Sequence, residues 1–263
     1  MASWSGSSGE RSTDRHRRFR LGGNQMNRWI LVIATTLTCS AQKTYDVYRA
    51  VSPVTIDGKL DERAWRDAPS MGDFTFLWMK DGAKEQTIAK LLWDDENLYV
   101  SWQAHDKHIS AYVTQTNGPV YQDDCVEIFI APNPEKVKNY YNFEINAIGA
   151  MLSQARADWR LGELWWEPEG MRYRTSFHGR PKKDELPEDT QWVVEAAIPL
   201  SNFARDAVHT PPRNGDVWRL NLQRLGGKTD AQYSAWSPLP GDRPNFHQPE
   251  AFGIVRFVNK PPK

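Results

Sequence analysis

The sequence is poor in cysteine. It has two, Cys39 and Cys125, in 263 residues, and Cys39 falls in a leader that we expect to be removed. The remaining thiol then has no partner, so an intramolecular disulfide is excluded. Cys125 opens an apolar run, where a single cysteine is usually a small buried hydrophobic residue. We therefore assign it to the core and give it no catalytic role.

Positive charge is not in excess either. The 33 basic and 33 acidic side chains cancel over the whole chain. Residues 1–41 contain six Arg and two acidic side chains, which leaves 27 basic and 31 acidic side chains, a net charge of −4, for residues 42–263. Proteins that bind nucleic acids concentrate Lys and Arg on one face. The mildly acidic remainder therefore predicts no nucleic-acid partner.

The apolar run near the N-terminus is short. Residues 29–38 give about ten apolar positions, whereas a transmembrane helix needs about 20. The run follows a basic segment that ends at Arg28, and small residues, Ser40 and Ala41, come after it, an order typical of a signal peptide. We predict a leader at residues 1–41, cleavage before Gln42, export to the periplasm, the cell surface or the medium, and no membrane span afterwards. The alternatives are a lipid anchor at Cys39 and an uncleaved anchor.

The rest of the chain is rich in short β-prone runs separated by turn residues, a pattern that predicts a sandwich or barrel. We expect strands at residues 45–50, 87–93, 98–105, 126–131, 140–146, 150–155, 172–177, 192–199, 217–224 and 253–258. Residues 60–67, with Asp61 as a candidate cap, and residues 200–203 are the expected helical segments. The predicted fold is all-β: a two-sheet antiparallel, jelly-roll-like β-sandwich with one or two short helices, in a single domain over residues 42–263.

Tryptophan is frequent. The chain has 12, of which two precede residue 42 and ten remain. Most lie inside apolar patterns and are expected in the core, Trp93 and Trp102 among them. Trp159, Trp165 and Trp166 lie in a polar loop context, where an exposed ring is costly unless something covers it. They either pack across one end of the sandwich or form a platform for a pyranose ring, whose flat C–H face matches an aromatic ring.

Polar residues interrupt three of the apolar strands at alternate positions. Successive strand residues point to opposite faces, so residues two apart share a face. The residues concerned are Glu127, Glu144, Asn146, Arg219, Asn221 and Gln223. If the three strands are neighbours, one sheet face presents carboxylates and amides, which suit sugar hydroxyls because each hydroxyl both donates and accepts. The alternative is a solvated outer face without a ligand.

Five segments, in order along residues 45–258, resemble carbohydrate-binding module family 9. They are residues 54–65 (VTIDGKLDERAW), 92–100 (LWDDENLYV), 122–130 (QDDCVEIFI), 194–199 (VEAAIP) and 246–253 (FHQPEAFG). The resemblance implies an exported β-sandwich module that binds an oligo- or polysaccharide without catalysis. Members of this family typically hold the end of a sugar chain between two aromatic rings.

The resemblance also implies positions for the site. The two aromatic positions fall near Tyr121 and at Phe246, and a position that carries Arg in the family carries Glu144, which reverses its charge. The family's polar binding positions fall at Glu127, Asn146, Gln223 and Asn245. Because neither aromatic position holds Trp, we expect Tyr121, Phe246, Trp165 and Trp166 to rebuild the pocket for another sugar.

The family resemblance implies no required cofactor, although members can carry structural Ca²⁺. Carboxylate and amide oxygens are the ligands that Ca²⁺ prefers. The acidic segments at residues 94–97 and at Asp123 and Asp124 are the candidates here.

Three rival functions remain open. Glu127 and Glu144 could form the acid/base pair of a glycosidase, which needs two carboxyl groups about 5–10 Å apart, although no hydrolase motif accompanies them. His105 and His108 could bind a metal or haem, but this spacing in a turn is weak as a metal site, and no Cys-x-x-Cys-His motif is present. The third rival is a surface assembly protein with a vestigial sugar site.

Overall fold

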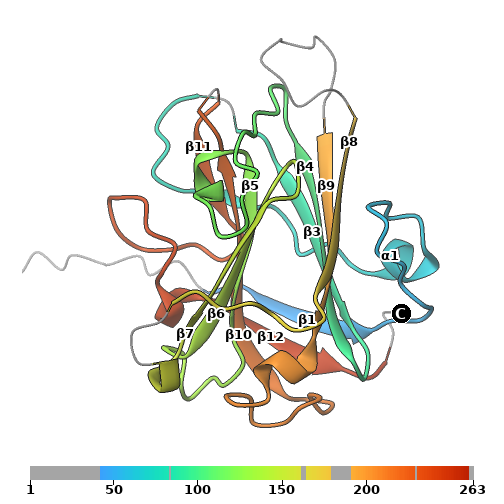
Figure 1. Cartoon of the computed structure of the whole chain (residues 1–263). Helices are drawn as coiled ribbons and strands as arrows, with labels where there is room; N and C mark the ends of the chain where they lie inside the picture. The colour runs from blue at the N-terminus through green and yellow to red at the C-terminus, as the bar shows by residue number, and fades with distance from the viewer. Residues whose placement is uncertain (1–41, 83, 161–163, 179–190, 229, 261–263) are drawn as a thin grey trace, which may run out of the picture. The chain divides into compact units, whose positions relative to one another are not determined.

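The computed structural model describes residues 42–82, 84–160, 164–178, 191–228 and 230–260 (Figure 1). Its strands are β1 (Thr44–Arg49), β2 (Thr75–Phe76), β3 (Thr87–Trp93), β4 (Asn97–His105), β5 (Cys125–Ala131), β6 (Tyr140–Asn146), β7 (Met151–Arg156), β8 (Arg172–His178), β9 (Gln191–Pro199), β10 (Val217–Gly226), β11 (Gln232–Ala235) and β12 (Gly253–Val258). Helix α1 is Arg63–Asp67, and 3-10 turns are η1 (Val120–Gln122), η2 (Asp158–Arg160), η3 (Leu200–Phe203) and η4 (Pro249–Ala251). Over these ranges no helix has the length and apolarity to cross a membrane. The predicted leader lies outside the described residues.

The all-β prediction is confirmed, but the strands form one continuous ladder. Its order is β7-β6-β5-β10-β12-β1-β3-β4-β9-β8, with β11 on β10 and β2 on β11. Figure 1 shows the ladder curled, so that β5, β6, β7 and β10 face β3, β4, β8 and β9. The expected two separate sheets are therefore not confirmed: β12 and β1 join the two halves of one curled sheet.

The expectation of purely antiparallel pairing is wrong at β1. This strand runs parallel to both of its neighbours, β12 and β3. Parallel neighbours require a long crossover connection, and the chain between β1 and β3, which includes α1, supplies one. The pairing with β12 joins the first and last strands of the described chain.

The ten strands expected from the sequence all occur, with ends within two residues of the predicted ones. The sequence patterns did not indicate β2 and β11, which are two and four residues long and pair with each other. Helix α1 begins at Arg63, three residues later than predicted, and its N-cap is Glu62 in place of Asp61.

A main core lies between the two halves and is built around tryptophan. Trp93 and Trp102 are 2% and 1% exposed, which confirms their assignment to the core. Phe257 lies edge-on to Trp93, with 5.3 Å between ring centroids, and to Trp218, at 4.9 Å. Edge-to-face contacts of this kind are a favoured aromatic geometry.

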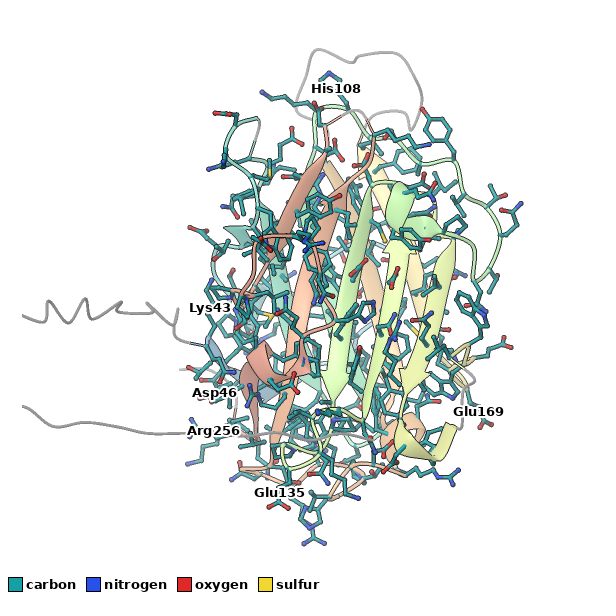
Figure 2. The ribbon with its side chains drawn as sticks, turned by 90° about the vertical axis from the view of Figure 1, so that its left-hand side faces the viewer. Lys43, Asp46, His108, Glu135, Glu169 and Arg256 are labelled. Atoms are coloured by element: carbon teal, nitrogen blue, oxygen red, sulfur yellow. The ribbon has the colours of Figure 1, made fainter. Side chains whose placement is uncertain are left out.

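A second, smaller core covers part of the opposite face of β5 and β6, here called the outer face. Phe129 and Tyr140 point to this face and pack against Phe252, and Phe246 belongs to the same cluster; Phe246 and Phe252 lie in the segment that follows β11. Figure 2 looks onto this face, with the green strands β5 to β7 beside the red-brown strands of the C-terminal part. The outer face is therefore only partly exposed to solvent, and the candidate site lies where the cover is incomplete.

Candidate functional site

The strand register brings the predicted acidic residues together. In the antiparallel ladder Glu127 of β5 lies directly opposite Glu144 of β6 and, on its other side, opposite Gln223 of β10. Directly opposed residues point to the same face. The three polar strands are therefore neighbours, as the sequence prediction required, and Glu127 and Glu144 form an acid pair on the outer face.

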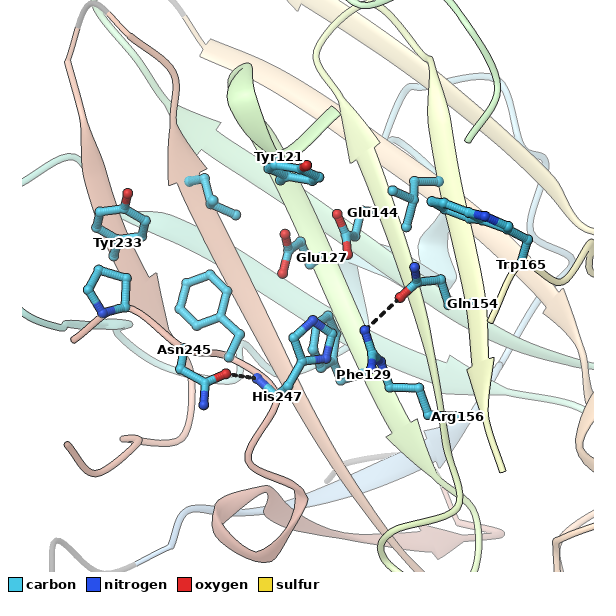
Figure 3. Close-up of a pocket in the computed structure, with 14 residues that line it drawn as sticks. Tyr121, Glu127, Phe129, Glu144, Gln154, Arg156, Trp165, Tyr233, Asn245 and His247 are labelled. Atoms are coloured by element: carbon cyan, nitrogen blue, oxygen red, sulfur yellow. Dashed lines mark hydrogen bonds between the residues drawn. The ribbon is translucent and has the colours of Figure 1, made fainter. Parts of the chain in front are cut away.

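A cavity of about 390 Å³ lies over the acid pair. This volume is within the range of about 300–1,000 Å³ that is usual for small-molecule sites. Figure 3 shows the two carboxylates in its centre, with Tyr121 above them, Tyr233 on one side and Trp165 on the other. Phe129 also lines the cavity, on the same face of β5 as Glu127. The site thus has an acidic floor with aromatic rings at its rim.

The rim is built from three different elements. Tyr121, in η1, is 49% exposed, and Trp165, which forms an isolated bridge with Gln154 of β7, is 53% exposed. Tyr233 comes from β11. Exposed rings at the rim of a cavity give a flat apolar surface on which a sugar ring can stack.

Trp166, by contrast, does not belong to the site. Because neighbouring residues in an extended chain point to opposite sides, it faces the main core. Its ring packs against Tyr141 and Phe143, with centroid distances of 4.9 and 5.8 Å. The two tryptophans that the sequence left equivalent therefore have different roles: Trp165 borders the cavity, whereas Trp166 holds its loop onto the core.

The acid pair is almost fully buried. Glu127 is 3% exposed and Glu144 5%. The Oε2 atom of each carboxyl group has no hydrogen-bond partner among the described residues, whereas Oε1 of Glu144 accepts a hydrogen bond of 2.9 Å from Asn142 Nδ2. Most buried polar atoms in native proteins are hydrogen-bonded, so two unpartnered carboxyl oxygens on directly opposed residues are an unusual feature of this face.

Burial also changes how the pair titrates. It raises the pKa of Glu127 well above its usual range, and the neighbouring Glu144 raises it further. Burial raises the pKa of Glu144 to about 7, although the hydrogen bond from Asn142 and the charge of Arg156 oppose the shift. Removal from water disfavours the charged form, and a second carboxylate alongside adds to the penalty. The pair therefore keeps at least one proton at neutral pH.

A basic side chain lies beside the acid pair without pairing with it. Arg156 of β7 donates a hydrogen bond of 3.1 Å to Gln154 Oε1, and its Nε has no partner in the described part of the chain. Nearby, the hydroxyl of Tyr140 and Nδ1 of His247 share a hydrogen bond of 2.9 Å. Burial, together with the charge of Arg156, lowers the pKa of His247 to about 4. His247 is thus neutral at pH 7, and Arg156 carries the positive charge on this side.

Two predicted binding residues do not line the cavity. Asn146 is fully buried; its Nδ2 donates to Asp123 Oδ2 and to the Val113 carbonyl, each at 2.8 Å, and its Oδ1 accepts from the Ala150 amide. These bonds fix the loop that carries Tyr121. Gln223 is also fully buried, beside Glu127 in the register. Both side chains are therefore part of the sheet beneath the cavity and do not line it.

Two other predicted binding residues, Asn245 and Phe246, do line the cavity. Asn245 Oδ1 accepts a hydrogen bond of 3.0 Å from the backbone amide of His247, which shapes the turn at the rim. Phe246 borders the cavity but is 8% exposed, because it packs against Trp78 and Tyr233 with centroid distances of 5.8 and 6.3 Å. Phe246 therefore lies at the cavity with most of its ring packed against neighbouring aromatic side chains.

Several lining residues were not predicted. On β7, Gln154 and Arg156 lie two positions apart and face the cavity, while Met151 and Ala155 belong to the main core. The same alternation that singled out Glu144 could have indicated them. Tyr233 lies on β11, a strand that the sequence patterns did not indicate.

Two of the candidate calcium ligands make hydrogen bonds within the chain. Asp94 accepts hydrogen bonds from the amides of Glu96 and Asn97 and from the Tyr99 hydroxyl, so it closes a hairpin turn. Asp123 Oδ2 accepts hydrogen bonds from the Val113 amide and from Asn146 Nδ2. In the ranges that the structure describes, no three His, Cys, Asp or Glu side chains are grouped as metal ligands would be.

The histidines of the metal or haem alternative are not grouped either. Nδ1 of His108 shares a hydrogen bond with Asp230, whereas His105 is exposed at the end of β4. Their side chains therefore show no common ligand geometry.

An all-β sheet face with an acidic floor and a rim of aromatic rings defines a class of protein, the sugar-binding β-modules. Comparison with known sequences names the family. The chain belongs to carbohydrate-binding family 9, whose sequence model matches residues 75–257. This family consists of non-catalytic binding modules, so carbohydrate binding is the function that membership establishes.

Curated relatives match over part of their length. Endo-1,4-beta-xylanase A of Thermoanaerobacterium saccharolyticum is 31% identical over 228 residues, which are 86% of this chain and 17% of the relative. Endo-1,4-beta-xylanase C of Paenibacillus barcinonensis is 28% identical over 213 residues, 78% of this chain and 16% of the relative. The chain thus spans about a sixth of the length of these relatives.

Solved structures share the fold. A proposed carbohydrate-binding protein from Bacteroides uniformis superposes with a TM-score of 0.68 at 21% identity, covering 82% of this chain and 100% of the other. A family 9 module from Caldicellulosiruptor kristjanssonii in complex with cellotriose gives a TM-score of 0.55 at 19% identity, covering 82% and 95%. The same module in complex with glucose gives 0.57, covering 82% and 97%.

Proposed function

We propose that the cavity over β5 and β6 is the sugar-binding site of this protein. Tyr121, Trp165 and Tyr233 present rings on which pyranose faces stack, and the acid pair, Glu127 and Glu144, binds sugar hydroxyls. One observation carries the proposal: two nearly buried carboxyl groups with unpartnered oxygens open into a cavity bordered by two exposed aromatic rings. An unpartnered buried polar atom costs about 1–3 kcal/mol, which a bound hydroxyl relieves.

The ligand is an oligo- or polysaccharide, and glucose and cellotriose are the first probes because related structures contain them. Stacking supplies most of the affinity, while the carboxyl groups choose between sugars. We expect dissociation constants of about 10–1000 μM, which correspond to roughly −4 to −7 kcal/mol. Nothing in this arrangement requires a cofactor.

Calorimetric titration of the purified protein with both sugars tests the site. Tyr121→Ala and Trp165→Ala are each expected to weaken binding about tenfold or more, since aromatic contacts contribute beyond their buried area. Tyr112→Ala is the matched control, because Tyr112 is 57% exposed and does not line the cavity. Wild-type affinity in both cavity variants would place the site elsewhere, and no binding of any sugar would favour the assembly function.

We further propose that the site does not hydrolyse its ligand. Glycosidases place their two carboxyl groups on either side of the scissile bond, whereas Glu127 and Glu144 are directly opposed on adjacent strands and approach a ligand from the same side. The test is release of the aryl group from aryl-glycosides, with Glu127→Gln as the control. Hydrolysis that this variant loses would assign the pair a catalytic role.

The protein also carries a predicted export signal, and we propose that it acts outside the cytoplasm, where polysaccharides are found. Residues 29–38 and the small residues after them support this. Nucleic acid is not a proposed partner, because the cavity is acidic at its floor and residues 42–263 are mildly acidic.

A further inference from the structure

The acid pair is buried, yet no basic side chain in the described part of the chain forms an ion pair with it. We propose that the cavity prefers a cationic amino sugar, in which a protonated amine replaces a ring hydroxyl, to the corresponding neutral sugar, and that Glu127 and Glu144 select it. This inference rests on the proposed function of the cavity and identifies the chemical class of its ligand.

The geometry of the pair suits an ammonium group. Directly opposed residues of an antiparallel pair have their Cβ atoms about 4.5–5.5 Å apart, so Glu127 and Glu144 can reach one ligand atom together. Each has an unpartnered Oε2. An ammonium group has three donors, whereas a hydroxyl has one. A single amine can therefore donate to both oxygens when both carboxyl groups are ionised, whereas a single hydroxyl can donate to one of them.

Two other buried acids, Glu195 and Asp106, are compensated by partners that the pair lacks. Glu195 accepts from Trp65 Nε1 at 2.7 Å and from the amide of Gly58 at 3.0 Å. Asp106 forms an ion pair of 2.8 Å with the fully buried Arg224. At the cavity, within the described ranges, no basic group lies within ion-pair distance of Glu127 or Glu144.

A basic side chain that lines the cavity compensates the pair only in part. The charge of Arg156 opposes the upward shift in the pKa of Glu144, but Arg156 hydrogen-bonds to Gln154 and to neither carboxyl group, and His247 is neutral because burial lowers its pKa to about 4. Further charge compensation of the acid pair is thus left to a ligand. The rings of Tyr121 and Trp165 support the same ligand, because the negative face of an aromatic ring attracts a cation.

Binding of a cation should release a proton. The free pair keeps a proton near neutral pH because burial raises the pKa of both carboxyl groups. An ammonium between them favours the charged forms, so the carboxyl proton leaves to the buffer as the amine binds, and total charge is conserved. The titratable and charged groups that face the pair are Tyr121 of η1, Cys125 of β5, Arg156 of β7, Tyr233 of β11 and His247 after β11.

Calorimetry at pH 6.5 with glucosamine, glucose and N-acetylglucosamine tests the inference. Acetylation of the amine removes its charge, so size and charge are separated. We expect glucosamine to bind about tenfold or more tightly than either neutral sugar, because hydrogen bonds to charged groups are stronger than neutral ones. Titration in two buffers of different ionisation enthalpy should show that a proton is released with glucosamine and not with glucose.

The double variant Glu127→Gln, Glu144→Gln should bind all three sugars within about threefold of each other and release no proton, since its amides carry no charge. Glu135→Gln is the matched control, because Glu135 is exposed at the end of the β5–β6 hairpin (Figure 2). Thermal unfolding of each variant checks that the fold is retained.

The outcomes separate the two proposals. Glucose binding without a preference for glucosamine overturns this inference and leaves the proposed function intact. A glucosamine preference that survives in the double variant overturns it as well, since the pair would not be its cause. Absence of binding to all three sugars and to cellotriose overturns both proposals.

Discussion

Replacement of Glu144 by Gln should stabilise the protein in a pH-dependent way. Glutamine keeps the shape of the side chain, and its carbonyl can still accept the hydrogen bond from Asn142 Nδ2. It removes the charge that burial disfavours. Because Glu144 is 5% exposed, solvent screens this charge little. The substitution therefore measures the free energy of ionising Glu144 beside Glu127, including the repulsion between the two carboxylates.

The sign follows from the direction of the shift. The pKa of Glu144 rises from its usual 4.5 to about 7 on folding. A group whose pKa is higher in the folded state contributes stability at low pH, and that contribution is lost as the pH rises through the folded-state pKa. Each pKa unit corresponds to about 1.36 kcal/mol, so wild type should lose about 3 kcal/mol between pH 4.5 and pH 8 through this group.

Urea unfolding of wild type and Glu144→Gln from pH 4.5 to pH 8 measures the effect. The variant should exceed wild type by about 3 kcal/mol at pH 8 and match it near pH 4.5. The exposed Glu135→Gln control should stay within about 0.5 kcal/mol of wild type throughout, as is usual for surface substitutions. A variant that is less stable than wild type at pH 8, or a difference that does not change with pH, would refute the reasoning.

Three further predictions concern the core, the rim and the leader. Trp93→Ala should cost about 3–5 kcal/mol in urea unfolding, because the ring is buried edge-on against Phe257; a cost under about 1 kcal/mol would contradict this. Phe246→Ala should cost about 3 kcal/mol and also weaken sugar binding, so unchanged stability would show that its ring is not packed. N-terminal sequencing of the exported protein should begin near Gln42, and a mature chain that keeps residues 29–38 would contradict the leader prediction.

Much of the fold was predictable because it follows from local periodicity. Residues along a strand alternate between buried and exposed, and this period-two pattern can be recognised within about six residues of sequence. The same alternation placed Glu127 and Glu144 on one face, and the register then set them opposite each other. The sequence alone does not show whether these strands are neighbours. The strand order of the folded sheet shows that they are.

The rest of the site depends on contacts that no local pattern contains. Trp165 and Trp166 are adjacent in an identical context, and the bridge between Gln154 and Trp165 decides which ring faces the cavity. Asn146 has the alternation of a binding residue, yet its hydrogen bonds are to the loop that carries Tyr121. The purely antiparallel expectation failed for a similar reason, since nothing in β1 itself indicates that it joins two distant strands in parallel.

The unusual chemistry of the acid pair and the shape of the cavity have one structural origin. On an open sheet face Glu127 and Glu144 would be solvated, would titrate normally and would bind sugars weakly, because water competes for every donor. The segment after β11, with Phe246 and His247, covers part of the outer face and stops short of the pair. This cover removes water from the carboxyl groups and leaves a cavity with aromatic edges above them. The stability gained in Glu144→Gln and the ligand selectivity lost with it should therefore appear together, as expected where a binding site is kept at the expense of stability.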